Sequence, residues 1–127
     1  MKSYILSLDQ GTSSSRAILF DTEGNMVAKD QQPVKQYYPI PGHVEQNPFE
    51  ILETLISAAK NAISAAGIQS SQIASIGITN QRETIILWDK DTGKPVYNAI
   101  VWQDRRTSAF CAEMAKSPYA NIIREKT

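Results

Sequence analysis

The feature that most constrains this chain is a long amphipathic helix predicted between its third and fourth strand-like runs. Asn47 is a suitable N-cap, Pro48 suits the first helical position, and Glu50 is placed to complete a capping box. Apolar residues then recur at helical spacing as far as Ala66, and Gly67 predicts the end of the helix. A helix of this kind among strands indicates an α/β fold.

Four short apolar runs surround the helix. Residues 4–9, 16–21 and 26–31 precede it and are separated by turn-forming residues, which predicts an antiparallel meander of three strands. Residues 73–79 follow the helix and predict a short buried strand. Three strands, a helix and a further strand do not follow a simple βαβ alternation. A ribonuclease H-like mixed sheet flanked by helices begins in this way.

The rest of the chain predicts a hairpin and a second helix. Residues 84–89 and 96–102 read as the two strands of the hairpin, with Trp88 packed in the core. Residues 107–116 predict the helix. No repeat or linker divides the 127 residues, which are enough for one domain with a core.

Composition excludes several classes of protein. Thirteen basic and thirteen acidic residues cancel, so no net charge attracts the chain to nucleic acid or to a membrane surface. No apolar run has the length of a bilayer-spanning helix, and the N-terminus lacks the apolar core of a signal peptide. Cys111, the single cysteine, cannot form an internal disulfide and reads as a small packing residue. We therefore expect a cytoplasmic protein with no nucleic-acid partner and no membrane insertion.

The first of three polar clusters, residues 9–16, lies between two predicted strands. Gly11 permits a turn whose backbone N–H groups approach a ligand closely, the neighbouring hydroxyls can cradle phosphate oxygens, and Arg16 can add charge-assisted bonds. Asp9 would repel a phosphate, so its suitable role is to hold a Mg²⁺ ion that accompanies a nucleotide. The segment lacks the spacing and the lysine of a Walker A loop. It fits equally well a polar hairpin that satisfies only its own amides.

The second cluster, residues 80–83, follows the predicted strand 73–79. Arg82 offers only hydrogen-bond donors and Glu83 only acceptors, a combination that matches the hydroxyls of a polyol. Because adjacent strand residues point to opposite faces, the backbone must leave strand geometry if both side chains serve one ligand. The chemistry of the pair alone favours a solvated surface ion pair over a binding site.

The third cluster, residues 101–107, ends another apolar run. Trp102 could pack on the C–H face of a polyol while its indole N–H finds a polar partner, or it could pack in the core. Arg105 and Arg106 make too short a basic run to indicate a nucleic-acid site.

The three clusters together resemble a known family. The segments SLDQGTSSSRAILFD, GITNQRET and KPVYNAIVWQDRRT are similar to motifs of the glycerol kinases, a branch of the FGGY carbohydrate kinases in the actin/hexokinase ATPase superfamily. The likeness extends from Tyr4 to Thr127, and the second and third segments differ from those of xylulose and gluconate kinases. It implies ATP-dependent phosphorylation of glycerol to sn-glycerol 3-phosphate, with Mg²⁺, by a longer, homo-oligomeric parent protein.

The resemblance also implies a role for each cluster. The residues expected near the nucleotide phosphates are Gln10, Gly11, Thr12, Ser13, Ser14 and Arg16, with Asp9 near Mg²⁺, and those expected to bind glycerol are Arg82, Glu83 and Trp102. Family members are longer and have two domains, so residues 1–127 are expected to be the N-terminal part of the first, glycerol-binding domain. The catalytic base is expected beyond Thr127, which would leave the 127 residues inactive alone. The alternatives are another FGGY sugar kinase and a non-catalytic, actin-like nucleotide-binding protein.

Overall fold

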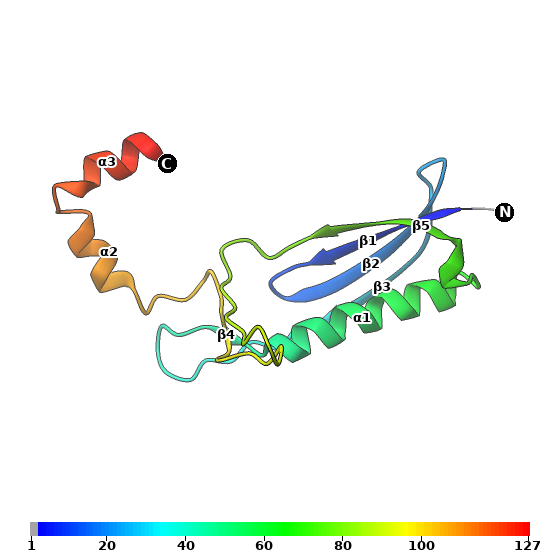
Figure 1. The fold of residues 1–127 in the computed structure, drawn as a ribbon, viewed down its shortest axis with the longest axis horizontal. Coiled ribbons are helices and arrows are strands. Elements are labelled where there is room, and N and C mark those ends of the chain that lie inside the picture. The colour runs from blue at the N-terminus through cyan, green and yellow to red at the C-terminus, as the bar shows by residue number, and fades with distance from the viewer. Residues whose placement is uncertain (1–2) are drawn as a thin grey trace.

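The main sheet of the computed structural model, which describes residues 3–127, has four strands (Figure 1). They are β1 (Tyr4–Gln10), β2 (Ser14–Asp21), β3 (Met26–Pro33) and β5 (Ile73–Thr79), in the order β3-β2-β1-β5. β1, β2 and β3 form an antiparallel meander, whereas β5 runs parallel to β1. The predicted meander and mixed sheet are thus confirmed.

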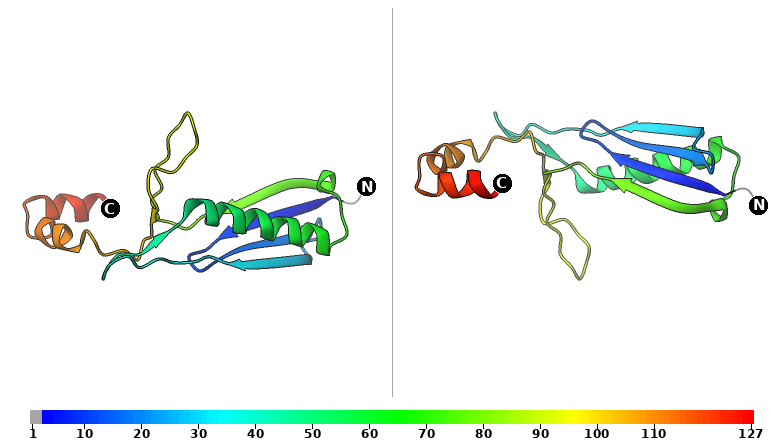
Figure 2. Two further views of the ribbon diagram at one scale, coloured as in Figure 1. Left: turned by 90° about the horizontal axis from the view of Figure 1, so that it is seen from below. Right: turned by 90° about the horizontal axis from the view of Figure 1, so that it is seen from above.

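α1 (Pro48–Ala65) covers one face of this sheet (Figures 1 and 2). Asn47 caps it, since its side-chain oxygen accepts a hydrogen bond from a first-turn N–H at 2.9 Å. Gly67 follows the last turn with a φ of +64°, a conformation that residues with a Cβ disfavour. Glu50, expected to complete a capping box, accepts instead from the Tyr37 hydroxyl at 2.7 Å.

The core lies between α1 and the meander. Its buried side chains come from one face of β1 and β2 and from the inner side of the helix: Leu6, Ala17, Leu19, Ala58 and Ala62. Tyr4 and Leu8 pack against them. Tyr4, Leu6 and Leu8, which alternate along β1, therefore share the core face.

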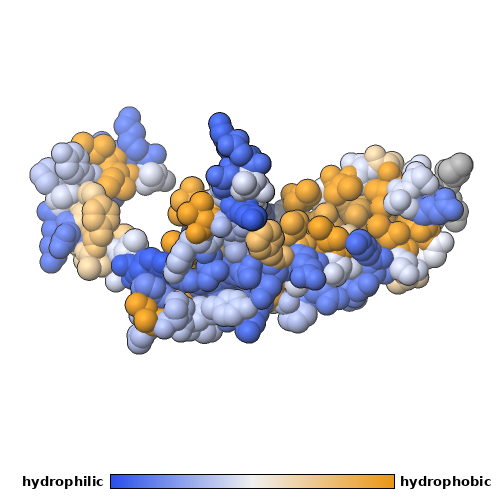
Figure 3. Space-filling view, turned by 60° about the horizontal axis from the view of Figure 1, so that its bottom comes forward, coloured by the Kyte–Doolittle hydropathy of each residue, from blue (hydrophilic) through white to orange (hydrophobic). Residues whose placement is uncertain are grey.

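β5 is less buried than predicted. Ile76 and Ile78 pair in register with Leu6 and Leu8, so they share the face that α1 covers elsewhere. Their exposed fractions are nevertheless 55% and 71%. The reason is that α1 packs mainly on β2 and β3 and leaves the β5 side of the sheet uncovered. The strand predicted over residues 73–79 is confirmed, but its predicted burial is wrong. Figure 3 shows apolar side chains gathered over the sheet.

Short elements connect the main sheet to the rest of the chain. A 3₁₀ helix, Ser70–Gln72, precedes β5, and β4 (Glu45–Gln46) pairs antiparallel with β6 (Ala99–Ile100). Between β5 and β6 the chain forms an excursion held by isolated bridges and not by regular strands, so the predicted hairpin exists only in outline. Trp88 is 62% exposed because this excursion projects away from the sheet (Figure 2), and its predicted place in the core is wrong.

The last two helices, α2 (Ser108–Met114) and α3 (Tyr119–Lys126), lie apart from the main sheet (Figure 1). α2 confirms the helix predicted over residues 107–116, whereas α3 was not predicted. Cys111 on α2 is exposed, so its prediction as a packing residue is wrong. Within residues 3–127, no helix combines the length and the apolar character needed to cross a membrane.

Candidate functional site

A hollow of about 380 Å³ opens where β1 and β5 end. Because these strands are parallel neighbours, their carboxyl ends lie at the same edge of the sheet, where α/β folds commonly bind ligands. All three polar clusters contribute to the lining: Asp9, Gln10, Gly11, Thr12, Asn80, Gln81, Arg82, Glu83 and Trp102. The predicted site residues Ser13, Ser14 and Arg16 lie outside it.

The turn between β1 and β2 requires Gly11. The Gly11 N–H donates to the carbonyl of Ser14 at 2.9 Å, and a Cβ at Gly11 would lie only 3.0 Å from that oxygen. The buried Gln10 amide donates to the Gly11 carbonyl at 3.1 Å and accepts from the Ser15 hydroxyl at 2.8 Å. The side chain of Gln10 therefore serves the turn itself.

The same turn leaves backbone donors unused. The N–H groups of Thr12 and Ser13 have no hydrogen-bond acceptor among the described residues 3–127. The sequence left open whether this turn satisfies its own amides or offers them to a ligand. Two successive free N–H groups favour the second reading, because such groups bind anions in turns of this kind. Ser13 is exposed, whereas the Ser14 hydroxyl accepts from the Gln31 amide at 2.8 Å.

Asp9 and Arg16 face each other across β1 and β2 and form an ion pair. Their side chains are 34% and 45% exposed, so the pair is partly solvated and adds little to stability. Among residues 3–127, no three His, Cys, Asp or Glu side chains gather into a metal site. Mg²⁺ keeps several waters and needs only one or two carboxylates beside substrate phosphates. Asp9 therefore fits a Mg²⁺ ion that arrives with a nucleotide.

The backbone leaves strand geometry directly after β5, as expected if Arg82 and Glu83 serve one ligand. Glu83 has a φ of +62°, a left-handed conformation that costs a residue with a Cβ about 1–2 kcal/mol. Both side chains are exposed and line the hollow. None of the three ion pairs found within residues 3–127 includes either of them. The solvated Arg–Glu pair considered from the sequence does not form.

Trp102 connects the third cluster to the first. Its indole N–H donates to the Thr12 hydroxyl at 2.9 Å, and the residue is 53% exposed beside the hollow. Of the two placements considered from the sequence, the structure has the ring at the polar hollow and not in the core.

Two residues of β4, Glu45 and Gln46, are buried next to the site and were not predicted. Glu45 accepts from the Asn98 amide at 3.0 Å, the Arg106 guanidinium at 2.7 Å and the Tyr97 hydroxyl at 2.9 Å. These hydrogen bonds, that of Asn98 foremost, hold the pKa of Glu45 below its usual value.

Arg106 lies between two carboxylates. Its guanidinium bonds Asp104 at 2.8 Å and Glu45 at 2.7 Å, and Asp104 also accepts from the N–H of Val44 at 2.7 Å. Hydrogen bonds from Arg106 lower the pKa of Asp104 despite its burial, and both carboxylates raise the pKa of Arg106. This trio, whose two carboxylates are buried, holds the segment that carries Trp102 against β4.

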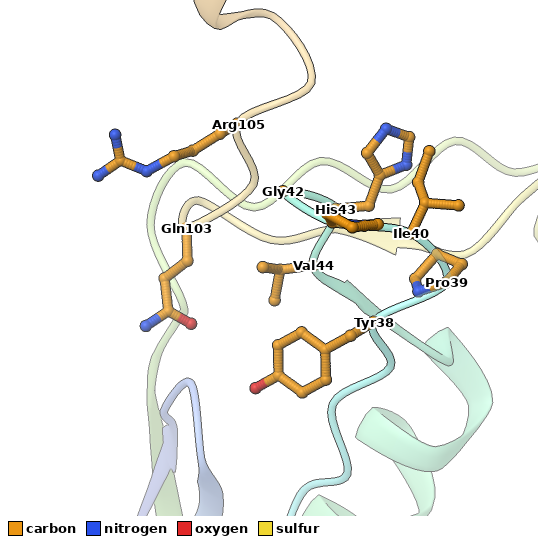
Figure 4. Close-up of a pocket in the computed structure, with 9 residues that line it drawn as sticks. Tyr38, Pro39, Ile40, Gly42, His43, Val44, Gln103 and Arg105 are labelled. Carbon is orange, nitrogen blue, oxygen red and sulfur yellow. The ribbon is translucent and has the colours of Figure 1, made fainter.

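A second hollow lies beside the connection between β3 and β4 (Figure 4). Residues 38–44 line most of it, with Gln103 and Arg105 at its edge. The Arg105 guanidinium and the His43 ring point in different directions and away from Tyr38 (Figure 4), so polar groups do not converge there. It contains none of the predicted site residues, and the hollow at the ends of β1 and β5 is therefore the candidate site.

Residues 4–127 match the N-terminal domain of the FGGY family of carbohydrate kinases. The chain belongs to this family. It is 60% identical to glycerol kinase 2 of Thermotoga maritima over 98% of its length, and 58% identical to the glycerol kinase of Bacillus subtilis over 100%. The FGGY-family chain spans about a quarter of the length of these relatives, 25% and 26% respectively.

Two solved kinases share the fold of this FGGY-family chain. Plasmodium falciparum glycerol kinase, solved with ADP, has a TM-score of 0.87 at 38% identity, over 99% of this chain and 25% of that one. The gluconate kinase of Lactobacillus acidophilus has a TM-score of 0.89 over 99% of this chain and 25% of that one, but only 22% identity, which shows the fold alone. The expected actin/hexokinase-like α/β fold is confirmed.

Proposed function

We propose that the full-length protein that carries this chain transfers the γ-phosphoryl group of ATP to glycerol and forms sn-glycerol 3-phosphate. The observation that carries the proposal is that Arg82 and Glu83 lie in the same hollow as Trp102 and the turn at Thr12. Neither Arg82 nor Glu83 belongs to an ion pair within residues 3–127. It is supported by the relatives named glycerol kinase, which are 60% and 58% identical over nearly the whole chain.

The polyol side of the site consists of Arg82, Glu83 and Trp102. A hydroxyl both donates and accepts, so vicinal hydroxyls can bridge a guanidinium, which only donates, and a carboxylate, which only accepts. The exposed Trp102 ring offers an apolar surface to the C–H groups of the same molecule. A site that matches hydroxyls one by one discriminates strongly against analogues that lack them.

The phosphate side consists of the β1–β2 turn. The free N–H groups of Thr12 and Ser13 are suited to phosphate oxygens, and Arg16 adds a positive charge next to them. Gln10 and Gly11 shape this turn, and Ser14 adds a hydroxyl. Asp9 would hold Mg²⁺, which, when bound, neutralises charge on the nucleotide phosphates.

Several expectations belong to the same proposal. We assign residues 1–127 to the N-terminal part of the glycerol-binding domain and place the catalytic base beyond Thr127. Phosphoryl transfer depends mainly on positioning and charge stabilisation, and this chain would supply the turn and part of the polyol site. A homo-oligomeric, cytoplasmic parent remains a prediction.

The test is Mg·ATP consumption by the full-length protein with glycerol, with 1,2-propanediol, with 1,3-propanediol and without a polyol. We expect kcat/KM for glycerol to exceed that for either propanediol by at least about 100-fold, because each diol lacks a hydroxyl that would pair with Arg82 or Glu83 in the site. Equal values for glycerol and a propanediol would contradict the assignment of Arg82 and Glu83. Faster turnover with xylulose or gluconate would indicate another FGGY sugar kinase, and nucleotide binding without turnover would indicate a non-catalytic protein.

A further inference from the structure

Five residues from four separate segments form a closed ring of hydrogen bonds beside the hollow. Gln46 Nε2 donates to the Thr12 carbonyl at 2.7 Å, and Gln81 Nε2 donates to Gln46 Oε1 at 3.0 Å. The Thr84 hydroxyl donates to Gln81 Oε1 and accepts from the Trp102 N–H at 3.4 Å. The Trp102 indole N–H returns to the Thr12 hydroxyl at 2.9 Å and closes the ring.

The chemistry of Thr12 and Trp102 together fixes the direction of every bond in this ring. A backbone carbonyl can only accept, so the Gln46 amide must present its NH₂ group to Thr12 and its oxygen to Gln81. Gln81 Nε2 then donates to Gln46 and, at 3.3 Å, to the Gly11 carbonyl of the same turn, and its own oxygen must accept from Thr84. Each amide has one arrangement that satisfies both of its neighbours, so the ring holds its members in one relative position.

Gln46 is the member whose burial needs explaining. It is completely buried on β4, and a buried amide is costly unless its polar atoms are paired. It does not line the hollow, so it is not placed to touch a ligand. Its two bonds instead connect the phosphate side of the site, through Thr12, to the polyol side, through Gln81.

The ring also encloses the strained part of the backbone. Gln81 and Thr84 are the residues on either side of Arg82 and Glu83, and both are bonded within the ring. Glu83 keeps its φ of +62° only if the surrounding structure holds it there. Gln81 and Thr84 therefore hold the backbone on both sides of Arg82 and Glu83.

We propose that Gln46, acting through Gln81, is a positioning residue that fixes the phosphate-binding turn relative to Arg82 and Glu83. The inference rests on the proposed function. The turn and the Arg82–Glu83 pair would each bind its own substrate without the ring. The ring sets the distance between the two substrates, and phosphoryl transfer is sensitive to that distance because a displacement of about 1 Å costs on the order of 100-fold in rate.

The test uses Gln46→Met in the full-length protein, since methionine keeps the length of the side chain and removes both hydrogen bonds. We expect kcat to fall on the order of 30-fold while KM for glycerol and KM for Mg·ATP each change by less than about threefold. Gln72→Met is the matched control, because Gln72 accepts one hydrogen bond from the Gln69 N–H at the far end of the sheet. It should leave all three constants unchanged.

A second readout does not depend on catalysis. Hydrogen exchange of the full-length Gln46→Met protein should be faster in residues 9–15 and in residues 80–85, and Gln72→Met should change neither segment. If Gln46→Met does not fold, the half-buried Gln81→Met takes its place, and because Gln81 lines the hollow only the exchange rates of the two segments are then compared. Where both fold, the double variant should lose far less than the product of the single losses, because the two amides act as one unit.

The proposal is overturned if Gln46→Met leaves kcat and both exchange rates unchanged, if it raises KM for one substrate only, or if Gln72→Met has the same effects. Failure of the proposed function looks different. In that case the wild-type protein shows no glycerol phosphorylation at all, and the exchange rates of the two segments alone decide whether Gln46 positions them.

Discussion

Arg106 and Arg82 each lie near a glutamate, Glu45 and Glu83, in opposite surroundings. Arg106 bonds Glu45 and Asp104, whose side chains are only 3% and 4% exposed, so every charge of the trio is paired. Arg82 and Glu83 are exposed and belong to no ion pair within residues 3–127, and Glu83 has a strained backbone conformation. The contrast shows that the type of a charged residue does not decide whether it stabilises the fold or is available to a ligand. Buried, paired charges hold the loops in place, and the unpaired charges are the ones we propose for binding.

The largest effect on stability should come from Arg106→Met. The substitution leaves two buried carboxylates side by side without a cation, so the free energy of unfolding of the 127-residue chain should fall by about 3 kcal/mol or more. Chemical denaturation followed by circular dichroism measures this. Arg105→Met, at the exposed neighbouring position, should stay within about 0.5 kcal/mol of the wild type. Equal losses in the two variants would contradict the distinction between paired and free charges.

Arg82→Met should impair activity and leave stability nearly unchanged, in contrast to Arg106→Met. In the full-length protein kcat/KM for glycerol should fall about 100-fold, because charge-assisted hydrogen bonds to the substrate are lost. The unfolding free energy should change by less than about 0.5 kcal/mol, because Arg82 has no ion-pair partner to lose. Arg124→Met on exposed α3 is the control for removing a positive charge. A loss of stability as large as that of Arg106→Met would show that Arg82 is structural.

The pH dependence of stability sharpens the same comparison. The pKa values of Glu45 and Asp104 are lowered from 4.5 and 3.8, so their contribution is present above those values and is lost as the pH falls through the lower, folded-state pKa values. The denaturation midpoint should therefore decrease below about pH 4. In Arg106→Met the unpaired carboxylates should have raised pKa values, so stability should increase as the pH falls from about 7 to 5. Asp21 and Asp89, which also have lowered pKa values, contribute equally to both proteins.

The smallest expected effect concerns the backbone of Glu83. At a φ of +62°, Glu83→Gly should be more stable than Glu83→Ala by about 1 kcal/mol, because glycine adopts this conformation without a Cβ clash. Both variants lose the carboxylate, so they should be equally impaired in glycerol phosphorylation. Thermal unfolding of the pair measures the difference. An alanine variant at least as stable as the glycine variant would mean that the strain is not present.

The sequence predicted those features that depend on residues close to one another along the chain, such as the two ends of α1. Cap chemistry predicted that α1 starts at Asn47–Pro48 and ends at Gly67. That the first two clusters belong to one site was expected only from the family resemblance, because their meeting depends on β5 lying parallel to β1 and next to it.

Burial that depends on distant parts of the chain was not predicted. Glu45 and Gln46 lie in a proline-rich connection that reads as surface, and their burial depends on β6 and Arg106, more than fifty residues away. The opposite error occurred at Ile78 and Trp88. Their apolar side chains indicate a preference for burial, but whether another element covers them depends on where α1 and the later segments pack.

The ion pair between Asp9 and Arg16 couples the binding of an anion at the β1–β2 turn to the binding of a cation. The two side chains neutralise each other, so neither a lone anion nor a lone cation meets an unopposed charge there. An anion that takes Arg16 leaves Asp9 without its cation, and a cation that takes Asp9 leaves Arg16 without its anion. Binding of the anion therefore raises the affinity for the cation, and by thermodynamic linkage binding of the cation raises the affinity for the anion by the same factor. Because the pair is more than one-third open to water, exchanging one partner for another requires little free energy.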